Sequence, residues 1–217
     1  MGKRLHRNGS TLYRLNMPST VSELLDAASL QLSGAVPWSE PVPSTAPSVY
    51  VISLSPDPDR NSRTEDAAPV HREAVMQWIH RVPMLTLDGG RAPSADALTR
   101  RLGEFWLPDE SVLYVGQTST SLRQRIRQYY RTPLGDRRPH AGGHWIKTLS
   151  TLAETLVYYA ESADPRTAES RLLQAFVDQV SASTKQALRD PNRPFPFANL
   201  EFPQGNRKQH GIANSKR

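Results

Sequence analysis

Three short apolar segments along the chain have the composition of buried β-strands. The first, at 48–54 (SVYVISL), is rich in β-branched residues and ends before Pro56. The second covers 111–116 (SVLYVG) and leads into a polar turn, and the third covers 154–160 (ETLVYYA). We therefore predict three strands at these positions.

Apolar residues at helical spacing predict the remaining elements. Ser19 or Thr20 is a suitable N-cap for the first helix, and Asp164 followed by Pro165 is a strong helix start. The predicted helices cover 21–32, 71–80, 95–106, 121–130, 144–152 and 164–181. This mixture of strands and helices indicates a small α+β domain.

Proline-rich and basic segments mark the predicted boundaries. Residues 34–47 contain four prolines, so we predict an N-terminal arm, a short helix and a Pro-rich linker over 1–47. The main domain is predicted over 48–200, with an insertion at about 56–110, and residues 201–217 form a basic tail.

The charge is unevenly distributed. Residues 1–110 carry 11 Lys/Arg against 13 Asp/Glu, whereas residues 111–217 carry 16 against 8. Such a basic half is suited to nucleic acid, although an acidic membrane surface or a solvated basic face fits the charge alone. The chain has no cysteine, which excludes disulfides, thiolate metal sites and a cysteine nucleophile. It also has no apolar run long enough for a membrane, so we expect a soluble cytoplasmic protein.

The helix at 121–130 places its arginines on two different flanks. Leu122, Ile126 and Tyr129 form its apolar face, and Arg125 lies one turn before Tyr129 at the edge of that face. Arg125 is therefore a candidate phosphate clamp, or it forms a salt bridge at the edge of the core. Three other arginines share a separate flank, suited to phosphates or to water: Arg123, Arg127 and Arg131.

The helix at 164–181 carries a carboxylate in its apolar sector. Glu169 falls among Leu172, Leu173 and Phe176, where an ionised side chain is costly unless it is paired or bound to metal. The alternative is that Glu169 lies beyond the edge of the core and complements the helix dipole.

Together these residues resemble the GIY-YIG nuclease family. The second half of its signature matches Leu113–Thr118 (LYVGQT), followed by Ser121–Ile126 (SLRQRI) and Tyr129. The first half matches residues 48–50 (SVY), with Ser in place of the usual glycine. The helical glutamate of the family corresponds to Glu169, and its late asparagine to Asn199. The resemblance covers roughly residues 48–200, with the elements in the family's order.

The resemblance implies a fold and a reaction. The fold is a GIY-YIG-type core with a three-stranded, mainly antiparallel sheet flanked by helices, here with a helical insertion between the first two strands. The reaction is hydrolysis of a DNA phosphodiester bond with one Mg²⁺, or Mn²⁺, held by Glu169. Arg125 neutralises charge in the transition state, and Tyr50 and Tyr114 act as general base and water-orienting group, with the assignment open. The implied catalytic set is Tyr50, Tyr114, Arg125, Tyr129, Glu169 and Asn199.

DNA contacts are expected from the basic residues that follow the second strand. His140 and His144 flank a Gly-Gly pair and suit a phosphate; the alternative, an HNH-type metal site, lacks the required Asp-His pair and spacing. The expected DNA-contacting residues are Arg123, Arg127, Arg131, Arg137, Arg138, His140, His144 and Lys147. In the insertion, Arg100 and Arg101 are candidates for base contacts or for a dimer interface.

We therefore expect an endonuclease acting on double-stranded DNA, a type II-like restriction or defence enzyme without a membrane partner. Cutting both strands favours a homodimer, at least on DNA. Two alternatives remain open at this point. One is a structure-specific repair or mobile-element nickase, and the other is a catalytically silent DNA-binding module.

Overall fold

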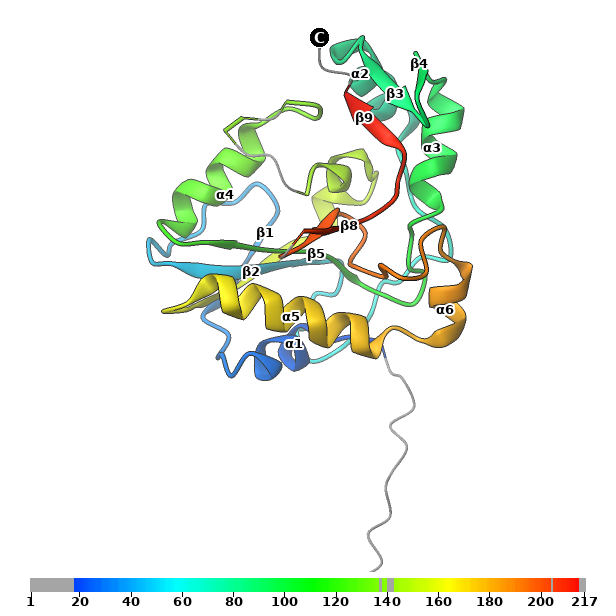
Figure 1. The fold of residues 1–217 in the computed structure, drawn as a ribbon. Coiled ribbons are helices and arrows are strands. Elements are labelled where there is room, and N and C mark those ends of the chain that lie inside the picture. The colour runs from blue at the N-terminus through cyan, green and yellow to red at the C-terminus, as the bar shows by residue number, and fades with distance from the viewer. Residues whose placement is uncertain (1–17, 137, 140–142, 204, 215–217) are drawn as a thin grey trace, which may run out of the picture.

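The structure, a computed structural model, describes residues 18–136, 138–139, 143–203 and 205–214 and has an α+β fold (Figure 1). Its central sheet has the order β1-β6-β2-β5 and is antiparallel throughout. The strands are β1 (Gly34–Pro37), β2 (Ser48–Ser53), β5 (Val112–Thr118) and β6 (Leu156–Glu161). The three predicted strands are present, with β2 paired to both β5 and β6.

The central sheet has four strands rather than three, because the segment predicted as a linker begins with a strand. Gly34 pairs with Tyr159 of β6, and Pro37 ends β1 at the edge of the sheet, where its missing N–H removes no ladder bond. A Cβ atom on Gly34 would lie 2.5 Å from the Tyr159 hydroxyl oxygen, so only glycine fits this close approach.

Helices cover both faces of the central sheet (Figure 1). On one face lie α1 (Val21–Ala27) and α5 (Pro165–Gln179), and on the other lie α4 (Leu122–Arg131) and the 3-10 helix η1 (His144–Thr148). Alternation along β2 divides the core accordingly: Val49 and Val51 pack in the cluster on the α5 side, and Tyr50 and Ile52 in the other. A second 3-10 turn, η2 (Leu152–Glu154), precedes β6.

Helix α1 is shorter than predicted. A capping box between Thr20 and Glu23 starts it, and the chain leaves the helix at Ala28 before the positive φ of Ser29 (58°). The remaining predicted helical residues instead lead into β1.

The segment between β2 and β5 forms a second unit together with the C-terminal residues. It contains α2 (Arg72–Arg81), β3 (Leu85–Leu87), β4 (Gly90–Arg91) and α3 (Ala95–Gly103). After α6 (Ala182–Ala187) and the hairpin of β7 (Glu201–Phe202) with β8 (Asn206–Arg207), strand β9 (Ile212–Asn214) pairs with β3. The described residues of the predicted basic tail are therefore folded, and they complete the sheet β4-β3-β9.

Buried polar groups fasten these C-terminal residues. Lys208 is fully enclosed and donates to the carbonyl oxygens of Phe195, Pro196 and Phe197. Arg101 of α3 donates to the carbonyl oxygen of His210 at 2.8 Å. Within the described part of the chain, no helix is both long and apolar enough to cross a membrane.

Candidate active site

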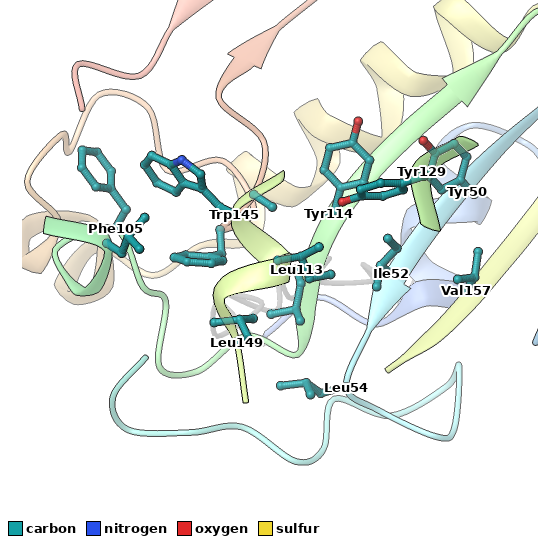
Figure 2. Packing of buried hydrophobic residues seen from close by; sticks show 14 of the residues in the cluster. Tyr50, Ile52, Leu54, Phe105, Leu113, Tyr114, Tyr129, Trp145, Leu149 and Val157 are labelled. Atoms are coloured by element: carbon teal, nitrogen blue, oxygen red, sulfur yellow. The ribbon is translucent and has the colours of Figure 1, made fainter. Parts of the chain in front are cut away.

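Three tyrosines pack together on the α4 side of the central sheet (Figure 2). The ring centroids of Tyr50 on β2 and Tyr114 on β5 are 5.9 Å apart, and those of Tyr114 and Tyr129 on α4 are 5.7 Å apart. All three side chains are buried. Tyr129 also donates a hydrogen bond to the carbonyl oxygen of Gly143, which fixes its ring.

Gly116 makes room for this tyrosine cluster. It lies directly opposite Tyr50 in the β2–β5 register. A Cβ atom there would come within 2.6 Å of Tyr50 Cζ and 2.7 Å of Tyr114 Cε1, closer than any real packing contact. The glycine that ends the Tyr-Val-Gly motif is thus required by the two rings that lie over it.

Arg125 lies beside the tyrosine cluster. Ser121 caps α4 by accepting from the Gln124 N–H, and the buried Leu122 and Ile126 fix the rotation of the helix. Arg125 is therefore held at the edge of the apolar face, as its helical position predicted. Its Nε atom is buried and has no hydrogen-bond partner among the described residues.

The Tyr50 hydroxyl is also buried without a hydrogen-bond partner among the described residues. Burial raises its pKa above the usual value, and the charge of Arg125 opposes that rise. Burial raises the pKa of Tyr114 and of Tyr129 well above the usual value, with Arg125 again opposing the rise. Of the three hydroxyls, Tyr50 is therefore the one that Arg125 influences most.

Glu169 reaches the same place from the opposite side of the sheet. Asp164 caps α5 by accepting from the Thr167 N–H, and Ala168 and Leu172 bury the helix face on which Glu169 lies. Burial raises the pKa of Glu169 to about 7, and the charge of Arg125 opposes this shift. In the described structure neither Arg125 nor Glu169 forms an ion pair within 4.0 Å, so both charges are open to a ligand.

Gln117 lies next to both charged residues, although sequence reasoning did not assign it to the site. It lines one cavity together with Arg125 and a second cavity together with Glu169. Its side-chain Oε1 is buried and lacks a partner in the described structure. The sequence signal was its place in the matched LYVGQT motif, directly after Gly116 and one residue before the end of β5.

Asn199 does not join this cluster but supports it. Its Oδ1 accepts from the Val115 N–H at 2.9 Å, and its Nδ2 donates to the Val115 carbonyl oxygen at 2.8 Å. The Asn199 side chain thereby pairs with both backbone hydrogen-bonding groups of Val115 on the outer edge of β5, two residues from Gln117. We interpret Asn199 as a positioning residue rather than a group that contacts substrate.

Several expected DNA contacts have structural partners instead. Lys147 donates to the carbonyl oxygens of Tyr129 and Thr132 at the end of α4, and burial lowers its pKa to about 8. Arg123 donates to the carbonyl oxygens of Val42 and Pro43. His144 is buried, with its ring centroid 6.5 Å from that of Tyr129. The remaining expected DNA contacts, Arg127, Arg131 and Arg138, are exposed, and Arg137 and His140 lie outside the described residues.

Arg101 of the insertion has a structural role rather than the expected base contact. It is buried and pairs with Asp88 at 2.6 Å and with Glu104 at 2.8 Å, in addition to its bond to His210. Its guanidinium is fully engaged in holding the insertion to the C-terminal segment. Arg100 remains exposed on the same helix.

A single carboxylate, rather than a cluster, is available for a metal at this site. Among the described residues no group of three or more His, Asp or Glu is arranged to hold an ion. Mg²⁺ accepts such a site, because it binds hard oxygen ligands and retains several waters. The half-buried Glu169 and the unpartnered Arg125 and Tyr50 groups beside it fit one hydrated cation and a phosphate.

In comparisons with known proteins, no family model, no curated protein and no solved structure matches the chain.

Proposed function

We propose that this chain is a metal-dependent endonuclease of the GIY-YIG type, which hydrolyses phosphodiester bonds in DNA. The observation that supports the proposal is that the charges of Arg125 and Glu169, from helices on opposite faces of the sheet, both act on the pKa of the Tyr50 hydroxyl, while Gln117 lines the cavities of both charged residues. A cation, a carboxylate that forms no ion pair within 4.0 Å, and a hydroxyl beside that cation are the groups that a phosphodiester, a divalent metal and an attacking water require.

In the proposed reaction, each residue acts on one atom of the substrate. Arg125 donates to a non-bridging phosphate oxygen, which supplies its buried Nε with an acceptor. Tyr50, in its ionised form, takes the proton of the attacking water, and the neighbouring Arg125 favours that ionised form against the effect of burial. Tyr114 orients the water. Glu169 would hold Mg²⁺ or Mn²⁺, which polarises a phosphate oxygen and stabilises the leaving oxygen.

The exposed basic residues of α4 suit the flanking DNA backbone. Arg127 and Arg131 lie on the solvent side of the helix that carries Arg125. A duplex phosphate held by Arg125 would place neighbouring phosphates within reach of that helix. Salt should therefore weaken binding, because each neutralised phosphate releases counterions.

The favoured biological form of this activity is a type II-like restriction or defence enzyme. The insertion and the C-terminal segment pack into a separate three-stranded sheet beside the catalytic core. Such a unit can recognise a sequence while the core cuts, since specificity needs contacts that reach base edges. Two copies acting as a homodimer on DNA would cut both strands.

Incubation of the full chain with Mg²⁺ and supercoiled plasmid tests the proposal. The wild-type chain should convert plasmid to nicked or linear DNA. Glu169→Gln should lose cleavage and still bind DNA, whereas Asp178→Asn, an exposed acid on the same helix, should cut normally. Mg²⁺-dependent cleavage by Glu169→Gln at the wild-type rate would refute the assignment.

The cut ends identify the class of substrate. Cleavage of unbranched plasmid at one sequence supports a restriction enzyme, and cleavage only at branched or distorted DNA supports a structure-specific nickase. A wild-type chain that binds DNA but cuts none of these substrates with Mg²⁺ or Mn²⁺ would show a silent binding module.

A further inference from the structure

A cavity of about 590 Å³ lies between the insertion, η1 and the C-terminal segment. Its walls include Trp78 of α2, Thr86 of β3, His144 and Trp145 of η1, and His210. None of Tyr50, Tyr114, Arg125 and Glu169 lines it. His144 connects the two regions, because it lines this cavity and also packs near Tyr129.

The cavity wall contains buried polar groups whose removal from water costs free energy. Lys208 lies in the wall with its ammonium group fully enclosed, and burial lowers its pKa to about 7. Arg101 is buried against two carboxylates and the His210 carbonyl oxygen. Burying such groups stabilises a fold little compared with apolar residues of similar size. These contacts hold residues 208–212 in a fixed position along one side of the cavity.

His210 presents a defined hydrogen-bond donor to this space. Its Nδ1 accepts from the Ile212 N–H at 3.0 Å, and burial lowers its pKa to about 4, so the ring is neutral. A neutral imidazole whose Nδ1 accepts carries its proton on Nε2. That Nε2–H has no partner among the described residues, and the His210 side chain is 93% buried, with 7% relative exposure, in the cavity wall.

Aromatic rings and groups of opposite hydrogen-bonding type complete the cavity. The ring of Trp145 lies edge-on to that of His210, with centroids 5.3 Å apart, and Trp78 contributes a second indole (Figure 2 shows Trp145). Asp136 and Gln209 add acceptors at the rim. A volume of this size is typical of small-molecule sites, which lie in the range of roughly 300–1,000 Å³.

We infer that this cavity binds a single unpaired nucleobase. A planar heterocycle in this cavity would lie against the Trp78 and Trp145 side chains in its wall, accept from the His210 Nε2–H through a ring nitrogen or carbonyl, and donate to Asp136 through an exocyclic amine. Proteins that read an extruded base combine these features. The inference rests on the proposed function in one respect, namely that the base belongs to the DNA that is cut.

Binding of the base can be tested without cleavage. Neutral nucleosides (adenosine, guanosine, cytidine and thymidine) are titrated into the full ¹⁵N-labelled chain, and the four indole N–H signals are followed by NMR. Addition of at least one nucleoside should shift the Trp78 and Trp145 signals in a saturable way and leave those of Trp38 and Trp106, which do not line the cavity, unchanged. Ribose alone should shift none of them. No saturable shift with any nucleoside would overturn the inference.

A blocking variant locates the bound base. Ala213 is an exposed residue of β9 that lines the cavity, and a phenylalanine there suits a strand while filling the opening. Ala213→Phe should weaken nucleoside binding at least tenfold, and Ala213→Ser should not. Equal binding by both variants would place the nucleoside elsewhere. Asp136→Asn, which keeps the shape of the cavity, should weaken the nucleosides that carry an exocyclic amine more than thymidine.

Cleavage assays then separate this inference from the proposed function. If the chain is a nuclease that uses the cavity, Ala213→Phe should raise KM or relax site choice at unchanged Mg²⁺ dependence. If Glu169→Gln abolishes cutting while Ala213→Phe cuts the same sites with the same KM, the result supports the proposed nuclease activity and contradicts base binding in this cavity. Saturable nucleoside binding by a chain that cuts no DNA would instead support the pocket and refute the nuclease.

Discussion

The positive charge of Arg125 acts on the carboxyl group of Glu169, although the two residues belong to helices on opposite faces of the central sheet. The two residues line separate cavities at β5, the edge strand, and Gln117 of that strand lines both cavities. The candidate site therefore lies at an edge of the sheet.

The pKa of Glu169 should respond to the charge at position 125. Burial raises this pKa to about 7 and Arg125 opposes the rise, so Arg125→Met should raise it further. Arg127→Ala, which removes an exposed charge from the same helix, should leave it unchanged. The measurement is the ¹³C shift of the Glu169 carboxyl carbon against pH without metal. An identical midpoint in wild type and Arg125→Met would show that the two groups are not coupled.

Removal of tyrosine hydroxyls should separate catalysis from stability. Tyr50→Phe removes a buried hydroxyl that makes no hydrogen bond of normal geometry, although Arg125 and Tyr114 lie beside it, so cleavage should fall about 10²–10⁴-fold while Tm changes little. Tyr129→Phe removes the bond to Gly143 and should lower stability by about 1 kcal/mol. Thermal unfolding and initial cleavage rates check both effects. A fully active Tyr50→Phe chain would assign the proton transfer to another group.

Gln117 should matter for turnover more than for folding. Gln117→Met keeps the length of the side chain and removes its polar atoms, so a bound phosphate and metal would lose a hydrogen-bonding neighbour. We expect a 10-fold or greater drop in kcat, on the order of 1.4 kcal/mol, with Tm preserved. The matched control is Gln124→Met, at an exposed residue that lines only the Arg125 cavity. Equal kcat values for the two variants would remove Gln117 from the site.

Stability should fall as pH rises towards 8 because of Glu110. This carboxyl group accepts from the Ser19 N–H, and burial raises its pKa to about 8. Between its unfolded pKa, about 4.3, and that value the folded chain holds a proton that the unfolded chain lacks, so raising the pH favours unfolding. Glu110→Gln should flatten this dependence and still accept from Ser19. Denaturant unfolding at pH 5 and pH 8.5 measures it, with exposed Glu154→Gln as the control that should keep the wild-type slope.

Periodicity in the sequence identified the parts of the site that depend on local structure. The position of Glu169 in an apolar helical sector, and of Arg125 at the edge of another, follow from 3.6-residue spacing, and the charges of both residues act on the pKa of Tyr50. Strands β1 and β9 escaped prediction because each is short and is defined by a distant partner, Tyr159 for Gly34 and Leu87 for Ile212.

The basic residues near the C-terminus led to the prediction of a tail, whereas the described residues of this segment are folded. Lysine and histidine near the end of a chain usually indicate exposure, whereas Lys208 and His210 are buried. Their burial depends on backbone carbonyl and N–H groups that only the folded loops bring into place. No local pattern in the sequence reports such partners.

The side chain of Asn199 has a consequence for how two copies of the chain can associate. Together with the Ala198 N–H, which donates to the Leu113 carbonyl oxygen, it occupies that oxygen and both backbone groups of Val115. An incoming strand from a second copy would find these three hydrogen-bonding groups already bonded. A continuous intermolecular sheet through this stretch of β5 is thereby prevented, so any dimer must be joined through side chains or through another part of the surface.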